Sequence, residues 1–499
     1  MRAKSVACLI RMAEPPTQPN RVHFVSLGCP KNRVDSEIML GHLQDAAMTV
    51  TDDAESADVI VVNTCGFIED AKKESIDVIL EMARHRTEGR ARQLIVTGCL
   101  VQRYAEEIAA EIPEIDVLLG NGAYSAVAQA AMSSSLAPVP RIQIEPPRFL
   151  HQATTPRVNT FLPHAAYVKV SEGCDQKCSF CAIPSMRGLQ RSRPIADIVD
   201  EVSTLGARGV VEVNLIAQDL TGYGTDLTPR ASLAELLRAL GPVEGVRWIR
   251  LHYAYPRPFS RALLAALAEE PKVLPYLDMP LQHIADPILK GMQRGRPRRF
   301  IEKLLADIRA AVPHIVMRTS FIVGFPGETE AEFKELLDFV EAEDFERVGV
   351  FRFSREEGTP SHDLPGQVPK ETIDERYDRL MRALAEKSRA RMASYVGRRI
   401  PVLVDGVSDE TDLLLTGRHA GQAPEIDGTT YINDGEASAG DIVELEVTEA
   451  FDYDIVGHVT RMLHPAPRRP DHPRLDRPEM KASSRPKHPQ RTSLRVLDG

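Results

Sequence analysis

Short apolar runs rich in β-branched residues alternate with longer segments of helical periodicity in the first part of the chain. The runs that read as strands are 22–27, 58–63 and 93–97. Segments with apolar positions at helical spacing, 68–86 and 102–112, follow the second and third runs. Strand and helix in alternation are typical of a parallel sheet that is covered by helices. We therefore predict an α/β domain with a doubly wound parallel sheet over residues 21–132.

The same alternation resumes six times between residues 160 and 393. The predicted strands are 166–171, 210–215, 248–253, 276–281, 315–323 and 347–353. Amphipathic helices lie between them, for example at 195–205 and 300–312. Six such units predict a partial (β/α)6 TIM-like barrel, in which functional residues occupy the loops at the C-terminal ends of the strands.

The remaining segments have other patterns. Residues 397–462 contain short strands and turns, with strands at 400–404, 412–416 and 442–447, and predict a small antiparallel β-barrel. Residues 1–20 are predicted to be an N-terminal extension, and the Pro- and Ser-rich stretch 133–159 a linker. Residues 463–499 are basic and rich in proline, which predicts a disordered tail.

Composition narrows the class of protein. The chain has 499 residues, of which 43% are hydrophobic and 26% charged, as expected for a globular protein of several domains. No run approaches the roughly 18 apolar residues of a membrane span, so no membrane association is expected. Seven cysteines, an odd number, favour reduced thiols and metal ligation in the cytoplasm over disulfides. The net charge of −10 argues against general nucleic-acid binding.

Three cysteines follow the first strand predicted for the partial barrel. Cys174, Cys178 and Cys181, which we call the loop set, have the spacing C-x3-C-x2-C. Three thiolates can hold three irons of a 4Fe-4S cube and leave the fourth iron open. A structural zinc site needs four protein ligands, and no fourth Cys or His lies nearby in the sequence. The spacing favours an open cluster that binds S-adenosylmethionine and passes it an electron.

Three further cysteines share one position relative to the predicted N-terminal strands. Cys29, Cys65 and Cys99, which we call the sheet set, each follow the end of a strand, and each has a glycine beside it. The C-terminal ends of neighbouring parallel strands meet at one edge of a sheet, so these thiols are expected to converge. The glycines would let the backbone approach a bulky cluster closely. Cys8 fits neither set.

The two sets together resemble those of the radical-SAM methylthiotransferases, and the resemblance extends over residues 21–458. It implies that the loop set binds the 4Fe-4S cluster that cleaves S-adenosylmethionine to a radical. It implies that the sheet set binds an auxiliary 4Fe-4S cluster that carries a sulfur, which agrees with the affinity of iron for sulfur. In that family one S-adenosylmethionine methylates this sulfur, and a second generates the radical that removes a substrate hydrogen.

Three other residues are predicted to contact S-adenosylmethionine. By resemblance, Phe180, just before the last cysteine of the loop set, lies near the adenine. Gln218, just past the second strand, lies where radical-SAM enzymes contact the amino-acid portion, although an ordinary loop glutamine is an alternative. Gly324, at the end of the fifth strand, is predicted to shape the cofactor pocket. The family also implies an electron donor such as flavodoxin or ferredoxin.

Local sequence points to one branch of this family, the RimO type. The run Ser26-Leu-Gly-Cys-Pro-Lys-Asn-Arg-Val-Asp-Ser-Glu resembles that branch, whereas relatives that modify tRNA typically carry Gly-Cys-Gln-Met-Asn. The resemblance implies methylthiolation of the β-carbon of an aspartate in ribosomal protein S-twelve, free or in the small ribosomal subunit.

The charge of the C-terminal barrel, which resembles a TRAM domain, is a separate indication of the substrate. Between Pro401 and Thr460 there are fourteen acidic residues and one basic residue, Arg418, a net formal charge of −13. RNA-binding modules contact phosphates through Lys and Arg, so this barrel suits a basic protein partner better. A merely solvated acidic surface is the alternative. We expect no direct sequence-specific binding of nucleic acid.

Two other functions remain open from the sequence. The first is the same chemistry on the adenosine next to the tRNA anticodon, which the acidic barrel and the Pro-Lys-Asn motif disfavour. The second is a non-catalytic iron–sulfur redox module, which would need neither a partial barrel nor S-adenosylmethionine. Cleavage of S-adenosylmethionine to 5′-deoxyadenosine separates the enzyme from the redox module.

Overall fold

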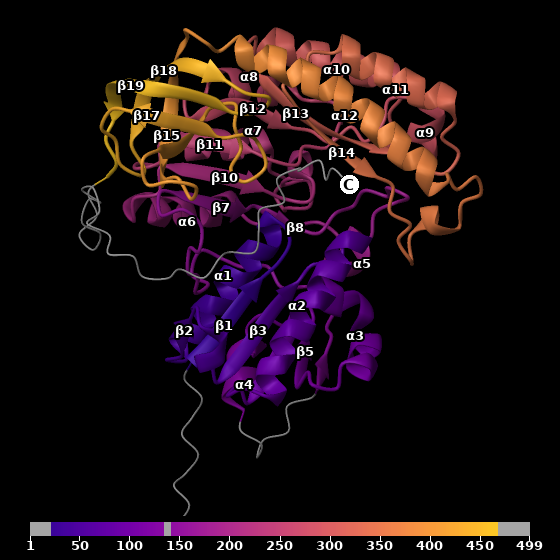
Figure 1. Ribbon diagram of the computed structural model, residues 1–499, viewed down its shortest axis with the longest axis vertical. Coiled ribbons are helices and arrows are strands. Elements are labelled where there is room, and N and C mark those ends of the chain that lie inside the picture. The colour runs from indigo at the N-terminus through magenta and orange to yellow at the C-terminus, as the bar shows by residue number, and fades with distance from the viewer. Residues whose placement is uncertain (1–20, 134–140, 468–499) are drawn as a thin grey trace, which may run out of the picture.

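The computed structural model describes residues 21–133 and 141–467, which form three units along the chain. Figure 1 shows the N-terminal unit at one end of the molecule, in indigo and violet, and the other two side by side at the opposite end. The predicted N-terminal extension with Cys8, residues 134–140 of the predicted linker and most of the predicted tail lie outside the described residues. No helix of the described part is long and apolar enough to cross a membrane.

The N-terminal unit is the predicted doubly wound parallel sheet. Its strand order is β2-β1-β3-β4-β5-β6, and every neighbouring pair is parallel. Its elements are β1 (Arg21–Ser26), α1 (Pro30–Asp45), β2 (Thr49–Thr51), β3 (Val59–Thr64), α2 (Glu69–Thr87), β4 (Gln93–Gly98), α3 (Cys99–Glu111), β5 (Val117–Leu119), α4 (Ala126–Met132) and β6 (Ile142–Gln143). Side chains alternate across β3: Val59 and Val61 pack in the core with α1 and α4, whereas Ile60 and Val62 pack in the core with α2 and α3.

The segment predicted as a linker is partly built into this unit. Ile142–Gln143 pairs in parallel with β5 as the edge strand, so the prediction of a linker was too broad there. Further along, Arg157 forms ion pairs with Glu37 of α1 at 2.6 Å and with Glu201 at 2.5 Å. Pro and Ser content predicted a free connection, but backbone pairing and buried ion pairs fix this stretch between the first two units.

The middle unit is the predicted partial barrel, an open parallel sheet of order β14-β13-β12-β11-β10-β7. Its strands are β7 (Ala165–Lys169), β10 (Glu212–Ile216), β11 (Trp248–Leu251), β12 (Val273–Asp278), β13 (Val316–Val323) and β14 (Arg347–Arg352), with the short hairpin β8 (Ser171–Glu172) and β9 (Arg191–Ser192) after β7. Its helices are α5 (Ile183–Arg187), α6 (Ile195–Ala207), α7 (Leu233–Leu240), α8 (Arg261–Glu269), α9 (Asp286–Gly291), α10 (Arg298–Ala311), α11 (Glu330–Ala342) and α12 (Lys370–Ala393). The helices α6, α7, α8, α10 and α11 contribute to one apolar core with the strands.

The C-terminal unit is a closed five-stranded barrel of order β15-β16-β17-β19-β18. Its strands are β15 (Arg399–Val407), β16 (Leu415–His419), β17 (Thr430–Asp434), β18 (Ile442–Ala450) and β19 (Ile455–His464). The barrel was predicted to be antiparallel, and every neighbouring pair is antiparallel except β17 with β19, which run parallel.

The C-terminal barrel is joined to the middle unit by apolar and ionic contacts. Trp248 of β11, the one tryptophan in the sequence, packs in a cluster with Leu403 and Ile442 of the barrel. Arg418 is buried and pairs with Asp405 of its own unit and with Glu212 of β10. The one basic residue counted in the acidic segment therefore anchors the barrel and is not available to a partner.

Candidate functional site: two groups of three cysteines

The sheet set lies at the C-terminal ends of three strands that are neighbours in the sheet. Cys29 follows β1 and precedes α1, Cys65 follows β3, and Cys99 opens α3 directly after β4. Gly28 has a φ of +89°, and a Cβ added there would lie 2.8 Å from Cβ of Cys65. A side chain at position 28 would thus collide with a cysteine of the set, which explains the glycine beside Cys29.

The three thiols of the sheet set are close enough to interact electrostatically. Burial and, after it, the charges of Cys29 and Cys99 together raise the pKa of Cys65 to about 12. Burial is also the main cause of the raised pKa of Cys99. Thiolates are the ligands of iron, and metal binding displaces their protons. The three thiols disfavour each other's ionisation. A cationic group between them would offset this repulsion, so the sheet set suits a metal cluster.

The loop set lies between the hairpin strand β8 and helix α5, near the C-terminal end of β7. Burial, with a smaller contribution from the charge of Cys178, raises the pKa of Cys174 to about 11 and that of Cys181 to about 12. Arg294 donates a hydrogen bond to Sγ of Cys178 at 3.4 Å. Within 21–133 and 141–467, no three His, Cys, Asp or Glu side chains are placed to bind one metal ion. This finding concerns a single ion and does not apply to a 4Fe-4S cluster, in which each thiolate binds a different iron.

A buried ionic network connects the two sets, and the sequence reasoning missed it. Arg187 of α5, 2% exposed, donates to Sγ of Cys99 at 3.3 Å and to Asp35 of α1 at 2.5 Å. Lys169 of β7 pairs at 2.5 Å with both Asp35 and Glu172. Burial tends to raise the pKa of Glu172, but Lys169 and Arg187 outweigh it and lower this pKa to about 2. The network therefore joins the N-terminal unit to Glu172 and Arg187, which flank the loop set.

The three residues predicted to contact S-adenosylmethionine lie in different environments. Phe180 is half-buried against Ala285, Met292 and Phe325. Gln218 donates to Glu172 at 2.6 Å, and its side-chain oxygen is buried without a partner. Such an orphaned acceptor fits a ligand that donates hydrogen bonds, such as the ammonium of an amino acid.

Gly324 has a φ of +81°, and a Cβ added there would lie 2.3 Å from Ile373 of α12. Close packing of β13 against α12 therefore accounts for this glycine without a ligand. Its amide donates to Glu328 at 3.0 Å. The role of Gly324 at the cofactor stays a prediction.

Lys31 is a second residue near the sheet set that sequence reasoning missed. It is only 9% exposed, and its amine lies 2.8 Å from the ring centroid of Tyr253, just after β11. Burial lowers the pKa of Lys31 to about 8, although Cys29 and Asp278 oppose this. The signal in the sequence was a lysine two positions after a predicted ligand, which alone does not distinguish a buried amine from a solvated one.

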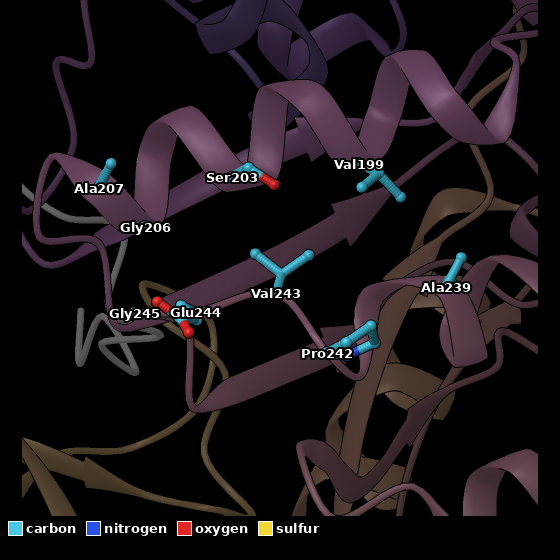
Figure 2. A pocket seen from close by; sticks show the side chains of 9 residues that line it. All are labelled: Val199, Ser203, Gly206, Ala207, Ala239, Pro242, Val243, Glu244 and Gly245. Atoms are coloured by element: carbon cyan, nitrogen blue, oxygen red, sulfur yellow. The ribbon is translucent and has the colours of Figure 1, made fainter.

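The hollow in Figure 2 lies elsewhere, between α6 and the segment that follows α7. It is lined by Val199, Ser203, Gly206, Ala207, Ala239, Pro242, Val243, Glu244 and Gly245. None of these is a cysteine, and the one charged side chain is Glu244. The hollow has no arrangement of groups that would suit either predicted cluster.

Three family models match the chain in succession. Residues 21–120 match the model described as uncharacterized protein family UPF0004, residues 168–340 match the radical SAM superfamily, and residues 396–460 match the TRAM domain. Together with the open parallel sheet and the closed barrel, these matches define a radical-SAM protein with an N-terminal α/β domain and a C-terminal TRAM barrel.

Curated relatives define the family more closely. Proteins named ribosomal protein uS12 methylthiotransferase RimO are similar over nearly the whole chain. The protein of Anaeromyxobacter sp. (strain K) is 54% identical over 90% of this chain and 96% of its own length. The protein of Myxococcus xanthus is 51% identical over 90% of this chain and 96% of its own length. That of Geobacter sulfurreducens is 48% identical over 88% and 98%. The chain belongs to this RimO family of radical-SAM methylthiotransferases.

Solved structures support the fold. The radical S-adenosylmethionine methyltransferase TsrM from Kitasatospora setae, with cobalamin and a [4Fe-4S] cluster bound, superposes with a TM-score of 0.51 at 17% identity. The match covers 69% of this chain and 77% of that one. A second structure of TsrM, with tryptophan and an S-adenosylmethionine analogue, has the same TM-score at 16% identity. At this identity the likeness concerns the fold alone.

Proposed function

We propose that this protein transfers a methylthio group to the β-carbon of an aspartate in ribosomal protein S-twelve, which is called uS12 in the names of its relatives. The observation that carries the proposal is 54% identity over 90% of the chain to a protein of that name. The proposal is supported by the two groups of three cysteines, which lie on consecutive domains that the buried network joins and would supply the sites that such chemistry requires. The proposed location is the cytoplasm, where ribosomes lie.

We assign the two clusters to the two sets. Cys174, Cys178 and Cys181 would hold the 4Fe-4S cluster that binds S-adenosylmethionine, and Cys29, Cys65 and Cys99 the auxiliary 4Fe-4S cluster. When bound, the clusters and S-adenosylmethionine supply the electron, the radical, the methyl group and a place for the transferred sulfur. The proposed source of the electron is a small carrier such as flavodoxin or ferredoxin.

The chain's own side chains orient and neutralise these groups. Glu172 fixes Gln218 through a hydrogen bond of 2.6 Å, which leaves the orphaned oxygen free for the ammonium of S-adenosylmethionine. Phe180 would cover the adenine, and Gly324 would shape the same pocket. Arg294 beside Cys178 and Arg187 beside Cys99 each place a cation at a thiolate ligand, one in each set.

The barrel offers an acidic surface that suits a basic protein. Several of its acids are occupied within the protein, for example Asp405 by Arg418 and Asp452 by Arg389. Exposed acids outside these pairs are Asp409, Glu410, Asp412, Asp434, Glu436 and Glu449. Complementary charge speeds the encounter of two proteins and suppresses wrong partners. We propose that these side chains favour S-twelve over tRNA.

Mass spectrometry of S-twelve and of tRNA from a deletion strain tests the substrate. We expect S-twelve to lose the mass of one methylthio group in place of hydrogen, with the tRNA unchanged. The purified, cluster-loaded protein should restore the modification in vitro and produce 5′-deoxyadenosine. Loss of the group from tRNA with S-twelve unaltered would refute the proposal.

A further inference from the structure

Lys31 occupies the junction between the sheet set and the mouth of the partial barrel. It lies in the first turn of α1, two residues after Cys29, and its amine rests on the ring of Tyr253, 2.8 Å from the centroid. Tyr253 follows β11 with a φ of +64°, an unfavourable backbone conformation for a tyrosine. Its amide donates to Asp278, the last residue of β12, at 3.3 Å. Strained residues of this kind cluster at functional sites.

The acids around Lys31 are already engaged by other cations. Asp278 pairs with Arg318 at 2.9 Å. Glu172 and Asp35 pair with Lys169, each at 2.5 Å, and Arg187 also reaches both. In the described part of the chain, Lys31 itself forms no ion pair with a carboxylate within 4.0 Å, although the charges of Cys29, Asp278 and Glu172 are near enough to act on it.

A buried ammonium without a carboxylate is costly, since a charge removed from water needs a partner. The face of an aromatic ring compensates only part of this cost. Each neighbouring carboxylate is already paired, and Cys29 is assigned as an iron ligand, so a carboxylate partner for Lys31 would come from outside the chain. The place of Lys31 beside Cys29 makes the substrate the natural source of that carboxylate.

We propose that Lys31 is the specificity-determining residue that binds the carboxylate of the aspartate to be modified. This inference rests on the proposed function, since it needs an aspartate substrate. A carboxylate is one bond from the β-carbon of its aspartate, so an ion pair with Lys31 also fixes that carbon. The same ion pair rejects a neutral side chain, because the lysine would stay buried and unpaired.

Binding of S-twelve peptides to the cluster-loaded protein under anaerobic conditions tests this role. The peptides carry either the target aspartate or asparagine at that position. We expect the unaltered protein to bind the asparagine peptide about tenfold more weakly, as for loss of a charged hydrogen bond. In the Lys31→Met protein, the aspartate peptide should bind about as weakly as the asparagine peptide. If the Lys31→Met protein preferred the aspartate peptide as strongly as the unaltered protein does, the proposal would be overturned.

Lys73→Met is the matched control, because Lys73 is an exposed lysine on α2. It should keep the full preference for aspartate. Iron content and the visible spectrum of each variant show whether both clusters are loaded, and Lys31→Gln provides a second neutral side chain. Both Lys31 variants should still cleave S-adenosylmethionine. Their loss of methylthio transfer should come from a higher KM for S-twelve more than from a lower kcat. If the unaltered protein modified no S-twelve at all, the proposed function would be wrong. If the Lys31→Met protein distinguished the two peptides as well as the unaltered protein does, only the role proposed for Lys31 would be wrong.

Discussion

The two groups of cysteines are built in opposite ways. Cys174, Cys178 and Cys181 lie within one loop, so their spacing along the chain already brings them near one another. Cys29, Cys65 and Cys99 come from the ends of β1, β3 and β4, and they meet because these strands are neighbours in a parallel sheet. The loop set needs a local backbone conformation, whereas the sheet set needs a folded domain. Changes to the fold should therefore affect the two sites unequally.

Removal of one cysteine from each set gives the largest expected effect. Each variant should lose one cluster, so that iron falls from about eight to about four per chain. Cys178→Ala should abolish the cleavage of S-adenosylmethionine, whereas Cys65→Ala should keep cleavage and lose methylthio transfer. Anaerobic reconstitution with assay of 5′-deoxyadenosine and of modified S-twelve measures both. Cleavage by Cys178→Ala would contradict the assignment of the loop set.

Arg187→Met tests the network between the two sets. The substitution leaves Lys169 as the one cation paired with Asp35 and Glu172 in this network, and it removes the contact with Cys99. Breaking a buried ion pair by removal of one partner costs about 3–5 kcal/mol. We expect thermal unfolding of the apo-protein at a temperature several degrees lower. Arg309→Met is the control, because it removes a half-buried pair between α10 and Glu343, the residue just after α11. It should shift the unfolding temperature far less.

The sequence predicted the fold and the position of Cys29, Cys65 and Cys99 at the ends of neighbouring strands, because both depend on regular signals. Apolar runs at strand and helix spacing located the six strands of the partial barrel, and the shared position after a strand selected the sheet set. The family matches and relatives confirm the fold and the family. The assignment of clusters to individual cysteines stays a prediction.

The contacts between the units were beyond sequence reasoning. Arg187 and Asp35 are 152 positions apart, and nothing in either neighbourhood indicates that they meet. From the sequence alone, Lys31 would be taken for a solvated helix residue, and only the structure shows its amine against the ring of Tyr253. The linker prediction was too broad at Ile142–Gln143 for the same reason, since a two-residue edge strand has no periodicity of its own. Each of these depends on tertiary packing.

Gly28→Ala should disturb the sheet set alone. The new Cβ would lie 2.8 Å from Cβ of Cys65, and position 28 has a φ of +89°. A strained conformation of this kind costs about 1–3 kcal/mol. We expect slower or incomplete loading of the auxiliary cluster with the loop cluster unaffected, seen as iron content between about four and eight with full cleavage of S-adenosylmethionine. Gly358→Ala is the control: it also has positive φ, but nothing lies within 4 Å of its added Cβ.

A change in the C-terminal barrel should alter stability and leave both sets of cysteines intact. Burial tends to raise the pKa of Asp405, but Arg418 and His164 lower it to about 2, below the ordinary 3.8. A lowered pKa gives stability above pH 3.8, here about 2 kcal/mol, which is lost as the pH falls toward 2. Asp405→Asn should therefore weaken the apo-protein at pH 6 and have progressively less effect below pH 4. Fluorescence of Trp248, which packs against the barrel, reports this unfolding. If the difference in stability between the unaltered and the Asp405→Asn protein stayed constant from pH 6 to pH 2, the ionised carboxylate would not be what holds the barrel in place.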